Sequence, residues 1–176
     1  MNPYFYVRQA CEGGQSLLAL CCGNGMELRK LTTEDVTAVD IVPEYLDEVK
    51  RLYPFVKTVK QDALNYVENA ADDSFDAISI IDGIEHFTKE RGKRLIKEMK
   101  RVARKQVILF TPDGFVRNEP HDAWGIHAEH ADEAQKHKSG WSQAELEKEG
   151  FMLVDEREYE SHHGEQYRAI MMRYMK

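Results

Sequence analysis

The sequence predicts an α/β protein with a mostly parallel sheet, helices on both faces and an antiparallel C-terminal hairpin. Short apolar or β-branched runs recur through the first 111 residues, and helical patterns separate them. Such alternation is typical of parallel strands joined by crossover helices. Two further strand patterns close the chain, and the short polar loop between them favours an antiparallel pair. Together these runs predict a seven-stranded sheet.

The expected strands are short and largely apolar, as strands buried on both faces of a parallel sheet are. Pro112 ends the fifth, because proline lacks the amide hydrogen that would continue the ladder. In chain order the strands are Ser16–Cys21, Val36–Asp40, Phe55–Val59, Ser74–Ile81, Gln106–Thr111, Phe151–Tyr159 and Tyr167–Tyr174.

The expected helices are recognised by their ends and their apolar faces. Pro43 suits the first turn of a helix, and Ser142 with Glu145 forms a capping box that Gly150 closes at the other end. The helix from Pro43 has an apolar face of Tyr45, Leu46, Val49 and Leu52. The other helices are Met26–Leu31, Ala63–Glu68 capped by Asp62, Thr88–Arg104 with Thr88 as its candidate cap, and Ser142–Glu149.

Length and composition limit the classes of protein. The 176 residues suit one domain, with a short N-terminal segment (1–15) and an insertion at 113–140. A net charge of −7 disfavours nonspecific nucleic-acid binding. No apolar run approaches the length of a membrane helix and no signal-peptide pattern begins the chain, so we expect a cytoplasmic protein without a membrane partner. Three cysteines, two of them adjacent, indicate reduced thiols rather than a disulfide framework.

The loop after the first expected strand is rich in glycine and opens the next expected helix. Its residues are Cys21-Cys22-Gly23-Asn24-Gly25. Glycines let a backbone approach a ligand closely, and a helix N-terminus offers free amide donors. Asp40 ends the second strand 15 residues after Gly25, where an acidic side chain can accept both hydroxyls of a ribose. Strand, loop, helix, strand and acid in this order predict a nucleoside-containing cofactor.

Two classes of cofactor use this layout. Dinucleotides normally need G-x-G-x-x-G, and the third glycine position counted from Gly23 is Leu28. The leucine side chain would obstruct the close packing of helix on strand that this glycine permits. A nicotinamide-dependent oxidoreductase is therefore the weaker alternative.

The sequence resembles the class I S-adenosylmethionine-dependent methyltransferase family, in its small-molecule, type-11-like branch, over nearly its full length. Ala19–Gly25 is similar to the motif D-L-G-C-G-x-G that ends the first strand of the family. Phe75–Ile78, Asp82–Phe87 and Ser139–Ser142 are similar to later segments. The resemblance implies a Rossmann-like fold, S-adenosyl-L-methionine as cofactor and methyl transfer as the activity.

The resemblance also implies roles for single residues. Asp40 would bind the ribose, Ile41 would pack on the adenine, and Asp62 would bond the adenine amino group. The full set of cofactor-binding residues expected in this way is Cys21, Cys22, Gly23, Asn24, Gly25, Asp40, Ile41, Asp62, Ala63 and Ile81.

Two positions depart from the family pattern. Ala19 stands where the family has an acid that orients the loop, and Cys21 stands where it has the first glycine. A noncatalytic domain that binds S-adenosylmethionine or S-adenosylhomocysteine therefore remains an alternative to an active enzyme.

The methyl acceptor is expected beside the loops after the fourth and fifth strands, because ligands bind beyond the carboxyl ends of parallel strands. Asp82, Glu85 and His86 lie there and are the candidate catalytic residues. His86 is suited to act as a base on a hydroxyl acceptor near neutral pH. The loop lacks the N-P-P-Y or D-P-P-Y of nucleic-acid amino methylation, which favours a small-molecule, sugar or lipid-like acceptor.

The segment 113–140 is rich in histidine and is expected to form part of the acceptor pocket. Its histidines include His121, His127, His130 and His137, whose spacings match no standard zinc pattern. We therefore expect no metal. Only about 15 residues precede the first strand, so the site is expected to be open, or closed by the acceptor or by a second subunit of a homo-oligomer.

Overall fold

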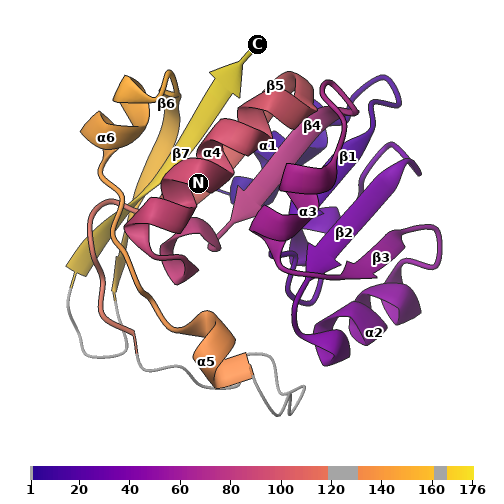
Figure 1. Ribbon diagram of the computed structural model, residues 1–176, viewed down its shortest axis with the longest axis horizontal. Coiled ribbons are helices and arrows are strands. Elements are labelled where there is room, and N and C mark those ends of the chain that lie inside the picture. The colour runs from indigo at the N-terminus through magenta and orange to yellow at the C-terminus, as the bar shows by residue number, and fades with distance from the viewer. Residues whose placement is uncertain (1, 119–130, 161–165) are drawn as a thin grey trace.

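A seven-stranded sheet forms the centre of the protein, in the order β3-β2-β1-β4-β5-β7-β6 (Figure 1). The computed structural model describes residues 2–118, 131–160 and 166–176. The strands are β1 (Leu17–Leu20), β2 (Val36–Asp40), β3 (Lys57–Lys60), β4 (Phe75–Ile81), β5 (Ala103–Pro112), β6 (Met152–Glu160) and β7 (Gln166–Met175). The first five are parallel, and β7 runs antiparallel between β5 and β6. The predicted fold class is thus confirmed, including the C-terminal hairpin.

Helices cover both faces of the sheet, as expected. The helices are α1 (Pro3–Ala10), α2 (Pro43–Leu52), α3 (Ala63–Asn69), α4 (Lys89–Val102), α5 (Ala131–Gln135) and α6 (Gln143–Lys148). One core cluster packs α3, α4 and α6 on the sheet, and a second packs α1 and α2 on the other face. Among the described helices, none has the length and apolar character needed to cross a membrane.

The first strand is the most enclosed element. All four of its residues are 0% exposed, and it pairs in parallel with β2 on one side and β4 on the other. Ala19 lies between Ala38 of β2 and Ser79 of β4 in this register. Because the three strands run the same way, the loops that follow them meet at one edge of the sheet.

The prediction of a helix over Met26–Leu31 is wrong. A single 3₁₀ turn, η1 (Met26–Leu28), forms instead, and Lys30 then takes a positive φ of 60°. Only ten residues separate Gly25 from Val36, and they must bring the chain back along the whole of β1. One turn buries Leu28 and Glu27, and the chain leaves the helical conformation at Arg29 and Lys30.

Two smaller expectations also fail. Leu52 is 44% exposed rather than part of the buried face of α2, because that helix ends there. The third strand begins at Lys57 and not at Phe55, because Pro54 and Phe55 lie in a turn. Phe55 is 43% exposed and packs edge-on against Tyr53.

The predicted helix caps are confirmed. The Asp62 side chain accepts a hydrogen bond from the Asn65 amide at 3.0 Å, and Thr88 accepts one from the Arg91 amide at 3.4 Å. Ser142 and Glu145 complete the capping box in both directions. Caps of this kind are local, because donor and acceptor lie within one turn of each other.

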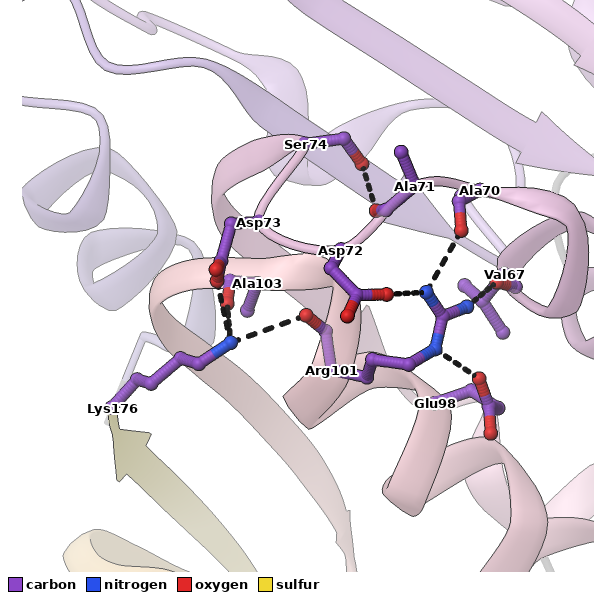
Figure 2. A network of polar contacts seen from close by, with 10 residues as sticks. All are labelled: Val67, Ala70, Ala71, Asp72, Asp73, Ser74, Glu98, Arg101, Ala103 and Lys176. Carbon is purple, nitrogen blue, oxygen red and sulfur yellow. Dashed lines mark hydrogen bonds and ion pairs between the residues drawn. The ribbon is translucent and has the colours of Figure 1, made fainter.

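Arg101 connects the end of α4 to the end of α3 (Figure 2). Its guanidinium donates to the carbonyls of Val67 at 2.7 Å and Ala70 at 2.9 Å, and to the carboxylates of Glu98 and Asp72. The arginine thereby satisfies carbonyl groups that the end of a helix leaves unpaired. Arg101, one of the many basic side chains of α4, is therefore used in contacts within the protein.

Trp141 locks the segment that follows β5 against α4. Its ring is 1% exposed, its Nε1 donates to Ser139 Oγ at 3.0 Å, and the Lys89 ammonium lies 3.9 Å from the ring centroid. Gly92 provides the space for the ring, because a Cβ at this position would lie 2.3 Å from Trp141 Cζ2. The glycine within α4 therefore serves packing at the expense of helix propensity.

We expect Gly92→Ala to destabilise the protein by about 1–3 kcal/mol through overpacking against Trp141. In an exposed helical position the same change would stabilise by roughly 0.5–1 kcal/mol, so the sign of the effect is diagnostic. Urea denaturation of both proteins measures it. Lys93→Ala on the exposed face of the same helix is the control and should change stability by less than about 0.5 kcal/mol.

Candidate active site

A cavity of about 800 Å³ lies at the carboxyl ends of the parallel strands. The strands or the loops that follow them contribute Cys21, Asp40, Asp62, Asp82 and Pro112 to its wall. Further walls come from residues 116–118 and 134–138, two parts of the segment between β5 and α6. The cavity lies where ligands bind in open parallel sheets.

The carboxylate of Asp40 holds the two loops at one end of this cavity together. Its Oδ2 accepts from the Gly23 amide at 2.9 Å, and its Oδ1 accepts from the Val42 amide at 3.0 Å. The side chain is 9% exposed. Burial raises the pKa of Asp40, and the amides of Val42 and Gly23 partly offset this. A carboxylate has about four lone-pair sites, so the group can also accept from a ligand.

The glycine loop is built around three left-handed residues. Cys21, Gly23 and Gly25 have φ values of 52°, 50° and 77°. Cys21 takes the conformation that favours glycine, and its side chain is accommodated by Gly83, where a Cβ would lie 2.9 Å from Cys21 Cβ. Burial raises the pKa of the Cys21 thiol well above its usual value, so this cysteine is not a thiolate at neutral pH.

The structure brings most of the expected cofactor residues to the cavity wall. Those that line it are Cys21, Gly23, Asp40, Ile41, Asp62 and Ala63. The remaining expected residues, Cys22, Asn24, Gly25 and Ile81, are not among its lining residues. Cys22 and Ile81 pack in the core cluster beneath α1 and α2, and a Cβ at Gly25 would lie 3.0 Å from Val49 of α2.

Asp62 has two structural partners besides its place in the cavity wall. It caps α3, and Arg91 donates to both of its carboxylate oxygens at 2.8 Å. Arg91 also lines the cavity, so this end of the wall carries an ion pair that the sequence analysis did not identify. The partners lie 29 residues apart in the chain, and only the packing of α3 on α4 brings them together.

Glu27 is a second residue that sequence analysis missed. It is 3% exposed, and its Oε2 has no hydrogen-bond partner within the described residues. Burial raises the pKa of Glu27 to about 8, and Ser79 partly offsets this. Ser79 lies beside Ala19 in the sheet. The acid that the family would have at Ala19 is absent, and Glu27 of η1 supplies a buried carboxyl group close to that position.

We expect the stability of the protein to fall as the pH rises towards 8 because of Glu27. Its folded pKa of about 8 lies above the ordinary value of 4.5, so the folded state keeps a proton that the unfolded chain releases. The contribution is complete below the unfolded pKa and is lost as the pH rises through the folded pKa. Over this rise in pH the Glu27→Gln variant should lose about 2–4 kcal/mol less stability than wild type, since one pKa unit corresponds to about 1.4 kcal/mol.

Urea denaturation at about pH 5 and about pH 8 measures this difference. Glu12→Gln is the control, because Glu12 is exposed. The assignment fails if wild type and Glu27→Gln lose the same stability between the two pH values.

The other end of the cavity contains the expected catalytic residues. Asp82, Glu85 and His86 all line it, together with His137 from the segment after β5. Glu85 Oε2 accepts from Thr111 Oγ1 at 3.0 Å, and His86 Nε2 lies 3.0 Å from the Asp82 carbonyl oxygen. Burial raises the pKa of Glu85 to about 7 and lowers the pKa of His86.

The backbone of Glu85 anchors the segment that contains His137. Its carbonyl oxygen accepts from the amides of Lys138 at 2.8 Å and Ser139 at 3.1 Å. As a result the rings of His86 and His137 lie 5.3 Å apart between centroids. His121, His127 and His130 lie outside the described residues, so the structure says nothing of their part in the pocket.

The comparisons with known proteins agree with this fold. Residues 17–106 match the family model described as a methyltransferase domain. This match covers more than half of the chain, and the chain therefore belongs to the methyltransferase domain family. The cofactor that goes with this family and fold is S-adenosyl-L-methionine. No curated protein sequence matches the chain.

Several solved structures share the fold at low sequence identity. The YcgJ protein of Bacillus subtilis has a TM-score of 0.70 and 13% identity, over 99% of this chain and 97% of that one. The 1,6-didemethyltoxoflavin-N1-methyltransferase of Burkholderia thailandensis, solved with 1,6-didemethyltoxoflavin and S-adenosylhomocysteine, has a TM-score of 0.64 and 17% identity, over 99% and 78% of the chains. A SAM-dependent methyltransferase from Archaeoglobus fulgidus has a TM-score of 0.62 and 18% identity, over 98% and 94%.

Proposed function

We propose that this protein transfers a methyl group from S-adenosylmethionine to a small-molecule acceptor. The observation that carries the proposal is a single cavity whose wall contains Gly23 and Asp40 as well as Asp82, Glu85 and His86. A volume of about 800 Å³ lies within the range of about 300–1,000 Å³ typical of small-molecule sites. Donor and acceptor can therefore lie in one enclosure.

The residues at the first end fit the cofactor. Asp40 lines the cavity, and the lone pairs of its oxygens that the backbone amides leave free are available to the ribose hydroxyls. Ile41 lines the cavity and is 48% exposed, which suits an apolar contact with the adenine ring. Asp62 remains the candidate partner of the adenine amino group, in an orientation that Arg91 holds.

The residues at the second end suit an acceptor that loses a proton. S-adenosylmethionine supplies a methyl group on a positively charged sulfur, so the protein mainly has to align the acceptor. The cluster of the buried Glu85 carboxyl group with the half-buried imidazoles of His86 and His137 favours a polar acceptor, and we infer an oxygen nucleophile. With the net charge of −7, this supports a small molecule rather than a nucleic acid.

Two observations favour a second candidate, a domain that binds the cofactor without turnover. Ala19 lacks the acid of the family motif, and Cys21 occupies a left-handed position where the family has glycine. The same cavity would then bind S-adenosylmethionine or S-adenosylhomocysteine alone. Incubation with methyl-labelled S-adenosylmethionine and a metabolite extract separates the candidates, because only the enzyme transfers label to an acceptor.

We expect Asp40→Asn to weaken binding of S-adenosylhomocysteine by about 10- to 100-fold, as loss of hydrogen bonds to a charged group costs about 1.5–3 kcal/mol. Isothermal titration calorimetry measures this change. The control is Asp35→Asn, an exposed acid just before the start of β2, and thermal unfolding checks that both variants fold. Tight binding of NAD and none of S-adenosylhomocysteine would overturn the proposal.

A further inference from the structure

Three potential metal ligands meet at the acceptor end of the cavity. Glu85, His86 and His137 each offer one ligand atom, and these atoms all lie within 4.8 Å of one another. Two of the residues are neighbours in η2 (Ile84–His86), and the third comes from the segment after β5. Sequence spacing cannot reveal such a set, because His137 lies 51 positions after His86 in the chain.

Both histidine rings are held in the tautomer that a metal ligand needs. His86 Nε2 faces the Asp82 carbonyl oxygen at 3.0 Å, and His137 Nδ1 faces the Val116 carbonyl oxygen at 2.6 Å. A carbonyl oxygen only accepts, so each of these nitrogens carries the hydrogen. The lone pairs are then on His86 Nδ1 and His137 Nε2. Metal-binding histidines almost always donate their other N–H in this way.

One of these lone pairs accepts no hydrogen bond within the described part of the chain. His86 Nδ1 is buried and makes no hydrogen bond among the described residues, although the backbone of Lys136 is close enough to help raise the pKa of the ring. A buried polar atom without a partner costs free energy, and a bound cation would give it one. The observation is independent of the proximity of the three residues and also indicates a ligand at this position.

The carboxylate of Glu85 is positioned in the same manner. Thr111 donates to its Oε2 at 3.0 Å, which leaves Oε1 for a metal ion. Glu85 is 2% exposed, so a divalent cation would offset the negative charge of its carboxylate, which the interior solvates poorly. The positive charge of Lys138 contributes to lowering the pKa of His86. Its ammonium group forms an ion pair with Glu133, with Nζ 3.7 Å from Oε1.

We propose that Glu85, His86 and His137 bind a divalent transition-metal ion at the acceptor end of the cavity. Two imidazoles and one carboxylate are typical of zinc and non-haem iron sites that keep a position open for a further ligand. Ligand atoms around a tetrahedral ion at about 2.0–2.2 Å lie about 3.4 Å apart. Ring rotations that bring the atoms about 1 Å closer are therefore enough to close the site.

The open position gives the ion a role that rests on the proposed function. A hydroxyl oxygen of the acceptor that binds the ion has a lower pKa, and its proton leaves to solvent. The oxygen then forms a bond to the methyl carbon while the bond from that carbon to sulfur breaks, and sulfur keeps the electron pair and becomes neutral. In this arrangement His86 is a metal ligand, in place of the general base expected from the sequence. The metal site also replaces the expectation that no metal binds.

Metal binding is tested on the full chain without any affinity tag, after treatment with a chelator. Calorimetry with Zn²⁺ and visible absorption with Co²⁺ measure affinity and stoichiometry in the absence of S-adenosylmethionine. We expect one ion per chain. His137→Ala and Glu85→Gln should each weaken binding by at least about tenfold, since loss of even an outer-shell partner costs about 10- to 100-fold.

Asp132→Asn is the matched control, because Asp132 is an exposed acid five residues before His137 and outside the cluster. The glutamine at position 85 still accepts from Thr111, and thermal unfolding without metal checks that each variant folds. The inference is overturned if wild type does not bind Zn²⁺, or if His137→Ala and Glu85→Gln both bind it as tightly as wild type.

A parallel titration with S-adenosylhomocysteine keeps the two proposals distinguishable. Metal binding without cofactor binding would overturn the proposed function and leave the metal site intact. Cofactor binding without metal binding would overturn the metal site alone.

Discussion

The candidate site depends on the burial of β1 between two parallel neighbours. Since β2, β1 and β4 run in one direction, the loops that follow them converge at one edge of the sheet. Cys21, Asp40 and Asp82 come together for this reason alone. The hydrogen bonds of the Asp40 carboxylate then fix the loop after β1 to the chain that enters α2. Both ends of the cavity follow from this arrangement.

The departures from the family motif have structural counterparts nearby. Cys21 occupies a left-handed position, and Gly83 of the adjacent loop leaves room for its side chain. Ala19 lacks a carboxyl group, and the buried carboxyl of Glu27 lies near its neighbour Ser79. The loop after β1 thus differs from the family motif in sequence, but neighbouring residues pack against it and hold it at the end of the strand.

The acceptor end is assembled by backbone hydrogen bonds as much as by side chains. The Glu85 carbonyl holds the amides of Lys138 and Ser139, and the buried Trp141 ring fixes the same segment against α4. These contacts place His137 beside His86. The segment after β5 is therefore connected to the chemistry of the cavity, and this connection underlies both the proposed acceptor and the proposed metal ion.

The sequence alone determined what depends on local pattern. Apolar runs predicted the seven strands to within a few residues, and Asp62, Thr88 and Ser142 predicted the helix starts, because strand burial and capping involve neighbours in the chain. The glycine loop and Asp40 indicated the cofactor end for the same reason.

Only the tertiary structure decided what depends on distance and available space. One 3₁₀ turn that buries Leu28 and Glu27 stands in place of an expected helix, although the residues themselves are good helix formers. Asp62 meets Arg91, Glu27 approaches Ser79, and His137 joins Glu85 and His86, each across a long stretch of chain. Such pairs leave no periodic signal in a single sequence, because they arise from the packing of elements whose order in space the chain does not display.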